Sequence, residues 1–263
     1  MKTTPLLGAN EPAPFELHNP GGEAPLLIVC DHASRRVPDA LDNLGLAPEH
    51  FAKHIAYDIG AATITRCLAE RLNARAVLSA YSRLVVDLNR QPNDPGAIPA
   101  ISDTIPIPGN QNLSAAQIAL RIATLHRPYH DAIRREIASL RQQHGQPPVL
   151  FSVHSFTPSL NGQDRIWHIG VLWNKDPRLP VALIERLRQW RDLTVGDNEP
   201  YSGRELAYTI DSHGLANGIA NCAVEIRQDR CATLEESSHW ADILADALRP
   251  ILDQPGIHAL KRY

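Results

Sequence analysis

The sequence lacks paired cysteines, long apolar stretches and an excess of positive charge. Its four cysteines are scattered without a Cys-x-x-Cys pair, so reduced thiols fit the chain better than disulfides or a cysteine-ligated zinc site. No apolar run reaches the ~18 residues that span a bilayer, and no signal-peptide core follows the first residues. We therefore expect a cytoplasmic protein with no membrane partner.

The charge balance excludes a further class of partner. The formal net charge is -3 at pH 7 and the isoelectric point is near 6.4, which gives no broad basic surface. Nucleic acid is therefore not expected as a partner. The length of 263 residues allows one large α/β domain or two small ones. Because no linker or internal repeat is visible, we predict a single domain over residues 1–263.

Apolar runs alternate with amphipathic segments along the chain. Strands alternating with helices predict an α/β fold, a three-layer sandwich with a mostly parallel, mixed sheet between helices. The predicted strands are 25–30, 76–78, 84–88, 149–153, 166–173 and 222–227, and the predicted helices are 59–72, 114–143 with a kink at Pro128, 180–190, 202–214 and 233–252.

Two segments are poor in regular structure. Residues 1–24 are rich in Pro, Gly, Asn and Glu, and they predict an arm that packs along the domain without building it. Residues 91–113 contain many prolines and glycines, and a loop of this length in a compact domain is more often functional than idle. We predict that this loop covers the active site.

The segment 82–91 reads as an apolar strand that ends in polar side chains. Arg83 lies near its start, and Asp87, Asn89 and Arg90 lie at its end. The carboxyl ends of strands form the rim of the ligand crevice in open α/β sheets. Two arginines and an amide at such a rim favour a carboxylate ligand, because the guanidinium fork matches a carboxylate. A salt bridge between Asp87 and Arg90 is the structural alternative.

Further polar residues end or interrupt other apolar strands. His32 and His154 each follow one, and Glu225 lies within another. Two histidines with one carboxylate are a common ligand set for catalytic zinc, and a nearby carboxylate can take the proton of the attacking water. The structural alternatives are hydrogen-bonded core histidines and an ion pair of Glu225 with a buried arginine, since an unpaired buried acid is expensive.

Six short motifs, in this order, resemble those of the N-formylglutamate amidohydrolases. The third of them in chain order, Asp-Leu-Asn-Arg, also looks like the substrate-carboxylate motif of the aspartoacylase and zinc carboxypeptidase group, whose phosphorylase/hydrolase-like fold the resemblance implies. The motifs are Asp31-His32-Ala33-Ser34, Tyr57-Asp58-Ile59-Gly60, Asp87-Leu88-Asn89-Arg90, His126-Arg127-Pro128-Tyr129-His130, Val153-His154-Ser155-Phe156 and Val224-Glu225-Ile226-Arg227.

The resemblance implies one zinc ion bound by His32 and His154. The carboxypeptidase group supplies its third ligand three residues after the first histidine, where this chain has Arg35, which cannot bind zinc. We assign the third ligand to Asp58, with Asp31 as the alternative. The residue spacing does not exclude other divalent ions.

The resemblance also implies roles around the substrate. Glu225 is the expected general base, and Arg83 is expected to polarise the scissile carbonyl, where an arginine stabilises the charge of the transition state. Asn89 and Arg90 are expected to hold the α-carboxylate. The weaker candidates for substrate contacts are Arg227, for a second carboxylate, and Ser155.

Three other histidines invite catalytic readings that the sequence does not favour. His126 and His130 lie four residues apart, but Pro128 lies between them and the Glu of a His-Glu-x-x-His motif is absent, so we predict a structural or supporting role. His213 follows Asp211-Ser212, but the chain has no Gly-x-Ser-x-Gly elbow, so a hydrolase triad is not predicted.

Together these observations favour a zinc-dependent amidohydrolase acting on a small N-acyl amino acid. The resemblance implies cleavage of N-formyl-L-glutamate to formate and glutamate, as a step of histidine degradation. One alternative is a metal-dependent deacylase of another N-acyl amino acid or a short peptide. The other is a metal-free protein that binds acidic metabolites through its arginines.

Overall fold

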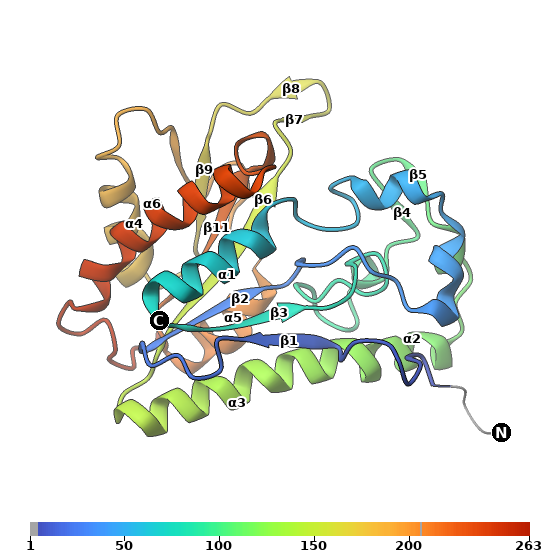
Figure 1. Ribbon diagram of the computed structural model, residues 1–263, viewed down its shortest axis with the longest axis horizontal. Coiled ribbons are helices and arrows are strands. Elements are labelled where there is room, and N and C mark those ends of the chain that lie inside the picture. Colours follow the sequence, from blue (N-terminus) through green and yellow to red (C-terminus); the bar gives the residue numbers. More distant parts are fainter. Residues whose placement is uncertain (1–4, 206) are drawn as a thin grey trace.

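The computed structural model describes residues 5–205 and 207–263, and a seven-stranded sheet runs through its centre (Figure 1). Four neighbouring strands, β3, β2, β6 and β11, are parallel, whereas β1 runs antiparallel to β3 and β9 runs antiparallel to β11; the edge strand β10 pairs parallel with β9. In spatial order the strands are β1 (Phe15–His18), β3 (Arg75–Ser79), β2 (Leu26–Cys30), β6 (Val149–Phe156), β11 (Asn221–Arg227), β9 (Ile169–Leu172) and β10 (Val195–Asp197).

Helices cover both faces of this sheet. On one face lie α1 (Ala61–Leu72), α4 (Arg178–Leu187) and α6 (Leu234–Leu252), and on the other lie α3 (Arg127–His144), preceded by α2 (Ala115–Arg121), and the short α5 (Tyr208–His213) (Figure 1). The predicted three-layer α/β sandwich with a mostly parallel, mixed sheet is confirmed.

The central strands are buried on both faces. In β2, Leu26, Ile28 and Cys30 pack into the core under α1 and α6, while Leu27 and Val29 pack into the core under α3. A strand covered on both faces needs an uninterrupted apolar run, which is why the strand at residues 25–30 could be predicted from the sequence.

The remaining elements are short. Two small hairpins and several single turns connect the layers. The hairpins are β4 (Ile101–Ser102) with β5 (Ile105–Pro106), and β7 (Ser159–Leu160) with β8 (Gln163–Asp164); the 3₁₀ turns are Asp39–Gly45, Pro48–Ala52, Pro95–Ala97, Pro108–Asn110, Leu215–Asn217 and Gln228–Arg230.

Two of the helix boundaries follow directly from side-chain caps. Ser114 and Gln117 form a capping box at the start of α2, and Thr233 and Glu236 form another at the start of α6. Such caps contribute ~1 kcal/mol each by satisfying amide groups that lack a helical partner. The helix predicted at 114–143 is interrupted, but by a π turn over Ile122–His126 and not at Pro128, which lies in the first turn of α3.

Other boundaries differ from the prediction. The helix predicted at 202–214 begins only at Tyr208; residues 203–205 form a turn, in which the Ser202 hydroxyl accepts from the amide of Arg204. The strand β6 continues to Phe156, so His154 lies within it. The short strand β10 was not predicted.

The N-terminal arm contributes to the sheet, contrary to the prediction for residues 1–24. Phe15–His18 forms the edge strand β1, which pairs antiparallel with β3 so that Phe15 lies opposite Ser79. An uncovered β3 would leave a row of unpaired amides and carbonyls at the sheet edge. Residues 1–4 lie outside the described part of the chain.

The predicted strand at 84–88 is wrong. Its apolar side chains are buried, but residues 82–90 form turns and irregular backbone. Four of its carbonyl groups accept hydrogen bonds from side chains, where a strand would have a neighbouring strand as partner. Asn110 donates to Leu84 O over 2.8 Å, Arg121 to Val85 O over 3.1 Å, His130 to Leu88 O over 2.9 Å and His126 to Arg90 O over 2.9 Å.

All four cysteines are free thiols, as expected. Within residues 5–205 and 207–263, no helix combines the length and apolar character required to cross a membrane.

Candidate active site

The carboxyl ends of three parallel strands bring the predicted site residues to one edge of the sheet. His32 follows β2, His154 lies near the end of β6, and Glu225 in β11 is the register partner of His154. Asp58 lies just before α1, and its amide donates to the carbonyl of His32. Parallel sheets bind their ligands at this edge, because loops and helix starts from several strands converge there.

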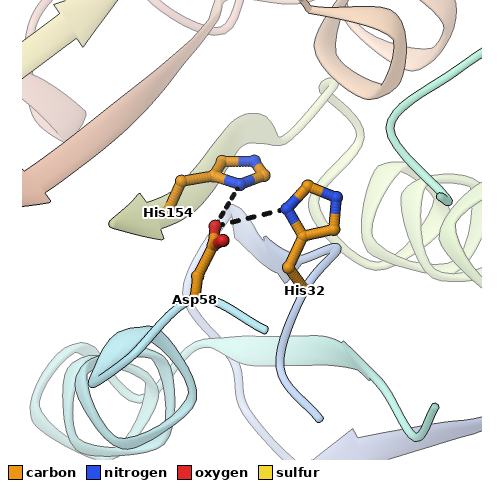
Figure 2. A group of neighbouring side chains, drawn as sticks. All are labelled: His32, Asp58 and His154. Atoms are coloured by element: carbon orange, nitrogen blue, oxygen red, sulfur yellow. Dashed lines mark hydrogen bonds and ion pairs between the residues drawn. The ribbon is translucent and has the colours of Figure 1, made fainter. Parts of the chain in front are cut away.

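His32, Asp58 and His154 form a buried cluster that could hold a metal ion. Their candidate ligand atoms all lie within 4.8 Å of one another. Asp58 Oδ2 lies 3.2 Å from Nδ1 of His32 and 2.9 Å from Nδ1 of His154, so both rings turn the same nitrogen toward one carboxylate oxygen (Figure 2).

Two further carboxylates, those of Asp87 and Asp31, lie behind the two rings. His32 Nε2 is 2.8 Å from Asp87 Oδ1, and His154 Nε2 is 3.1 Å from Asp31 Oδ2. A carboxylate that accepts from Nε2–H keeps the proton on that nitrogen and leaves the Nδ1 lone pair for a metal ion. The outer pair therefore orients both imidazoles with Nδ1 toward the centre of the cluster.

The carboxylates also control the ionisation of the cluster. Burial disfavours a charged imidazole, but hydrogen bonds from His154 to Asp31 and Asp58 outweigh burial and raise its pKa well above the ordinary value. Burial alone would raise the pKa of Asp31, but the hydrogen bond from His154 outweighs burial and brings the pKa of Asp31 down to about 2. The cluster thus attracts positive charge to the space between its Nδ1 atoms.

Asp31, the alternative third ligand, faces away from this space. Its Oδ1 accepts hydrogen bonds from Tyr129 OH at 2.9 Å and Thr209 Oγ1 at 2.8 Å, and its Oδ2 faces His154 Nε2. The carboxylate that converges with the two Nδ1 atoms is that of Asp58.

Arg83 is anchored by the same carboxylates. Its Nη2 donates to Asp87 Oδ2 over 2.8 Å, and its Nη1 donates to Asp58 Oδ1 over 3.3 Å. Asp87 therefore binds His32 and Arg83 together. The predicted alternative for Asp87, a salt bridge with Arg90, is a 3.9 Å contact, and Arg90 lies closer to Asp94, at 3.2 Å.

The backbone of the segment 82–90 is fixed from behind by a row of histidines. His130 Nε2 must carry its proton, because it faces the carbonyl of Leu88, so His130 Nδ1 accepts from His213 Nε2, 2.8 Å away. Burial lowers the pKa of His130 to about 3 and that of His213 to about 4, which keeps both rings neutral. The predicted structural or supporting role of His126 and His130 agrees with these contacts.

Asn89 is oriented by α5. The backbone amide of Thr209 donates to Asn89 Oδ1 over 3.0 Å. The oxygen of the Asn89 side chain is therefore occupied, and its NH₂ group remains as the donor for a ligand.

Glu225 lies in the cavity beside the metal cluster. Burial raises its pKa to about 7, and its Oε2 is buried without a hydrogen-bond partner among the described residues. A carboxyl group with a pKa near neutrality can both take up and release a proton at physiological pH.

The site residues surround a cavity of about 230 Å³. This volume lies below the roughly 300–1,000 Å³ of typical small-molecule pockets, so it suits a ligand of amino-acid size. The lining residues are His32, His54, Asp58, Arg83, Asp87, Asn89, Arg90, His154, Ser155, Leu172, Tyr201 and Glu225.

The structure places two predicted features outside this lining. Arg227 donates to Asp229 over 2.8 Å and to the carbonyl of Arg165 over 2.8 Å, and it is not among the residues that line the cavity. The residues that line the cavity include none from 91–113. That loop packs instead against the segment 82–90, where Ala97 O accepts from the amide of Asp87.

Four lining residues were not assigned a functional role from the sequence. His54 lies in a turn with its Nδ1 3.8 Å from Asp58 Oδ1, and burial lowers its pKa to about 4. Leu172 and Tyr201 come from a strand and a loop with no distinctive pattern in the sequence. Only Asp87 carried a signal, since it opens the Asp-Leu-Asn-Arg motif.

A family model matches most of the chain. Residues 24–232 match the model described as N-formylglutamate amidohydrolase. This span includes the three metal-cluster residues and Glu225.

Two curated relatives extend over nearly the same length. An N-formylglutamate deformylase of Pseudomonas putida is 31% identical over 248 residues, which cover 89% of this chain and 91% of the relative. The enzyme of the same name from Pseudomonas aeruginosa is 28% identical over 253 residues, covering 88% of this chain and 91% of the relative.

Two solved structures are similar along the whole fold. A gene product of Agrobacterium tumefaciens is 34% identical with a TM-score of 0.90, covering 94% of this chain and 98% of that chain. An N-formylglutamate amidohydrolase from Ralstonia eutropha is 18% identical with a TM-score of 0.69, covering 92% and 98%, which at this identity shows a common fold.

Proposed function

The chain belongs to the N-formylglutamate amidohydrolase family, and on this premise we propose that it hydrolyses N-formyl-L-glutamate to formate and glutamate with one divalent metal ion. The observation that carries the proposal is the convergence of two imidazoles and a carboxylate beside Glu225, in a cavity of about 230 Å³. A cavity of this size favours an N-acyl amino acid over the short-peptide alternative.

The charges of the buried cluster support a divalent cation. Metal-binding histidines are neutral, so the charges to balance are those of the carboxylates and of Arg83. Asp31, Asp58 and Asp87 are all buried and carry -3 together, and Arg83 contributes +1, which leaves -2. His32, Asp58 and His154 would hold the ion, which would supply Lewis-acid polarisation of a carbonyl oxygen and make water a better nucleophile at neutral pH. Two imidazoles with one carboxylate favour zinc.

Glu225 is the proposed proton carrier. It takes a proton from the attacking water and passes it to the nitrogen of the leaving amino acid. A pKa of about 7, raised by burial, suits both transfers. The unpartnered Oε2 supports this role, because no described group competes for its lone pairs.

Arg83 is the proposed donor to the scissile carbonyl. Its two ion pairs, with Asp58 and Asp87, hold the guanidinium at the cavity before the substrate arrives. A preorganised donor stabilises the oxyanion without the cost of reorganisation during the reaction.

Arg90 and Asn89 are the proposed ligands of the substrate's α-carboxylate. Arg90 offers a planar fork, and the free NH₂ group of Asn89 lies on the same wall. Ser155 adds a hydroxyl whose Oγ is buried without a partner among the described residues. Arg227 lies outside the cavity lining, so we leave it out of the proposal.

The test is metal content together with formate release. The purified protein is expected to contain one divalent ion per chain, and His32→Ala and His154→Ala are expected to lose both the ion and the release of formate from N-formylglutamate. His239→Ala, at an exposed position on α6, is the matched control and should keep both. A metal-free wild-type protein that binds acidic metabolites without turnover, even after metal is added, would overturn the proposal in favour of a binding protein.

We further propose that this activity is cytoplasmic and belongs to histidine degradation. We keep both as part of the proposal, together with a single domain over residues 1–263.

A further inference from the structure

Arg165 is a buried cation with no anionic partner in the part of the chain that the structure describes. Only 7% of the residue is exposed, yet within residues 5–205 and 207–263 no carboxylate oxygen forms a salt bridge with its guanidinium. The two arginines that line the cavity differ in this respect, because Arg83 is paired with Asp58 and Asp87 and Arg90 is paired with Asp94. A buried charge is costly unless an opposite charge or several hydrogen bonds compensate it.

The contacts of Arg165 compensate its charge in part. Its Nη1 donates to the carbonyl and the hydroxyl of Thr157, both at 3.3 Å, and its Nη2 donates to Tyr201 OH over 2.8 Å. The guanidinium carbon also lies 4.7 Å from the ring centre of Tyr201 and 5.5 Å from that of Phe156. Neutral groups and aromatic faces stabilise a guanidinium less than a carboxylate does.

Tyr201 connects this charge to the cavity. Its side chain lines the cavity, and its hydroxyl oxygen accepts the hydrogen bond from Arg165. The hydroxyl proton of Tyr201 is therefore free to be donated to a ligand. Burial raises the pKa of Tyr201, which keeps that proton in place. A donor that itself accepts a bond from a cation is polarised and becomes a stronger donor to an anion.

We propose that Tyr201 and Arg165 form the subsite for a second carboxylate, the one on the side chain of the substrate amino acid. Tyr201 contacts this carboxylate, and Arg165 supplies the positive charge from behind it. The inference rests on the proposed function and makes the enzyme selective for acidic N-acyl amino acids over their neutral isosteres. The α-carboxylate remains with Asn89 and Arg90.

The subsite is held in place by neighbouring backbone. Arg227 Nη1 donates to the carbonyl of Arg165 over 2.8 Å, and the amide of Arg165 donates to the carbonyl of Pro158 over 2.8 Å. The sequence suggested Arg227 for the second carboxylate. In the structure Arg227 instead positions Arg165, the arginine that we assign to that carboxylate.

The experiment compares two substrates that differ only in one charge, N-formyl-L-glutamate and N-formyl-L-glutamine. Arg165→Met is expected to lower kcat/KM for N-formylglutamate by about 10- to 100-fold and to leave N-formylglutamine within about twofold, because charge-assisted hydrogen bonds carry this discrimination. Tyr201→Phe is expected to shift the same ratio in the same direction. Arg191→Met removes one exposed arginine elsewhere and should leave the ratio unchanged.

The outcomes separate the subsite from a structural role. An equal loss on both substrates would mean that Arg165 only holds Thr157, Phe156 and Tyr201 together. An unchanged ratio of kcat/KM for the two substrates in both variants would likewise overturn the subsite. In either case the proposed function stands. A wild-type enzyme that releases no formate from either substrate would overturn the proposed function and this inference with it.

Discussion

Glu225 and His154 are register partners on adjacent parallel strands, β11 and β6. The pairing places a carboxyl group, whose Oε2 has no hydrogen-bond partner among the described residues, next to an imidazole that converges with Asp58 on a candidate metal position. The sheet itself therefore fixes the separation between the proposed proton carrier and the proposed metal ligands.

Replacing Glu225 should remove turnover and keep the metal. We expect Glu225→Gln to lower kcat by about 10²- to 10⁴-fold, the usual contribution of a general base. Metal content should stay at the wild-type level, because Glu225 is outside the His32, Asp58 and His154 cluster. Glu235→Gln, exposed on α6, is the control, and near-normal turnover in Glu225→Gln would exclude it as the base.

Removing the outer carboxylate behind His32 should weaken metal binding. Asp87→Asn keeps the shape of the side chain but loses its charge, and we expect about 10- to 100-fold lower metal affinity. Competition with a chelator measures this change. Asp103→Asn, in an exposed turn, should have the wild-type affinity. Unchanged affinity in Asp87→Asn would show that Asp87 does not orient His32.

Truncating His130 should destabilise the protein and raise KM. His130→Ala leaves the carbonyl of Leu88 without its donor, and an unsatisfied buried group costs ~1–3 kcal/mol, measurable by urea unfolding. Because Leu88 precedes Asn89 and Arg90, KM should rise more than kcat falls. If KM is unchanged, the histidine row does not position these two residues.

Stability should fall as the pH drops below about 6.5. Burial lowers the pKa of His130 to about 3 and that of His213 to about 4 in the folded state. As the pH falls, these two histidines therefore bind protons in the unfolded state before they do so in the folded state. Their stabilising contribution is complete above the unfolded pKa of about 6.5 and is lost as the pH falls toward the folded values, by up to ~1.4 kcal/mol per pH unit for each group. Urea midpoints between pH 7 and pH 4 measure the slope, which His213→Gln should reduce and His239→Gln should not.

The parallel core of the sheet and the candidate metal cluster could be predicted from the sequence. β2, β6 and β11 are buried on both faces, so each required a continuous apolar run, and His32, His154 and Glu225 stand out because they end or interrupt such runs. Asp58 was found by its place before a helix. Its convergence with the two histidines depends on the packing of α1 against the sheet, which the sequence alone did not settle.

Two of the errors arose because hydrogen bonds that the sequence pattern does not reveal fix a segment or a side chain differently from the expected way. The segment 82–90 has the composition of a strand, but Asn110, Arg121, His126 and His130 supply the donors that a neighbouring strand would have supplied. Arg227 has the position of a cavity residue, but Asp229 and the carbonyl of Arg165 hold its guanidinium elsewhere. No local sequence pattern predicts either outcome.

The way the segment 82–90 is anchored also restricts how it can move. A strand in a regular ladder can slide by two residues and recover its hydrogen bonds, because every partner offers the same groups. In this segment four carbonyls accept from four different side chains, an amide, a guanidinium and two imidazoles, so a slide leaves each donor facing the wrong acceptor. The spacing between Arg83 and Arg90 along the cavity wall is therefore fixed by four side chains that are not among the residues lining the cavity.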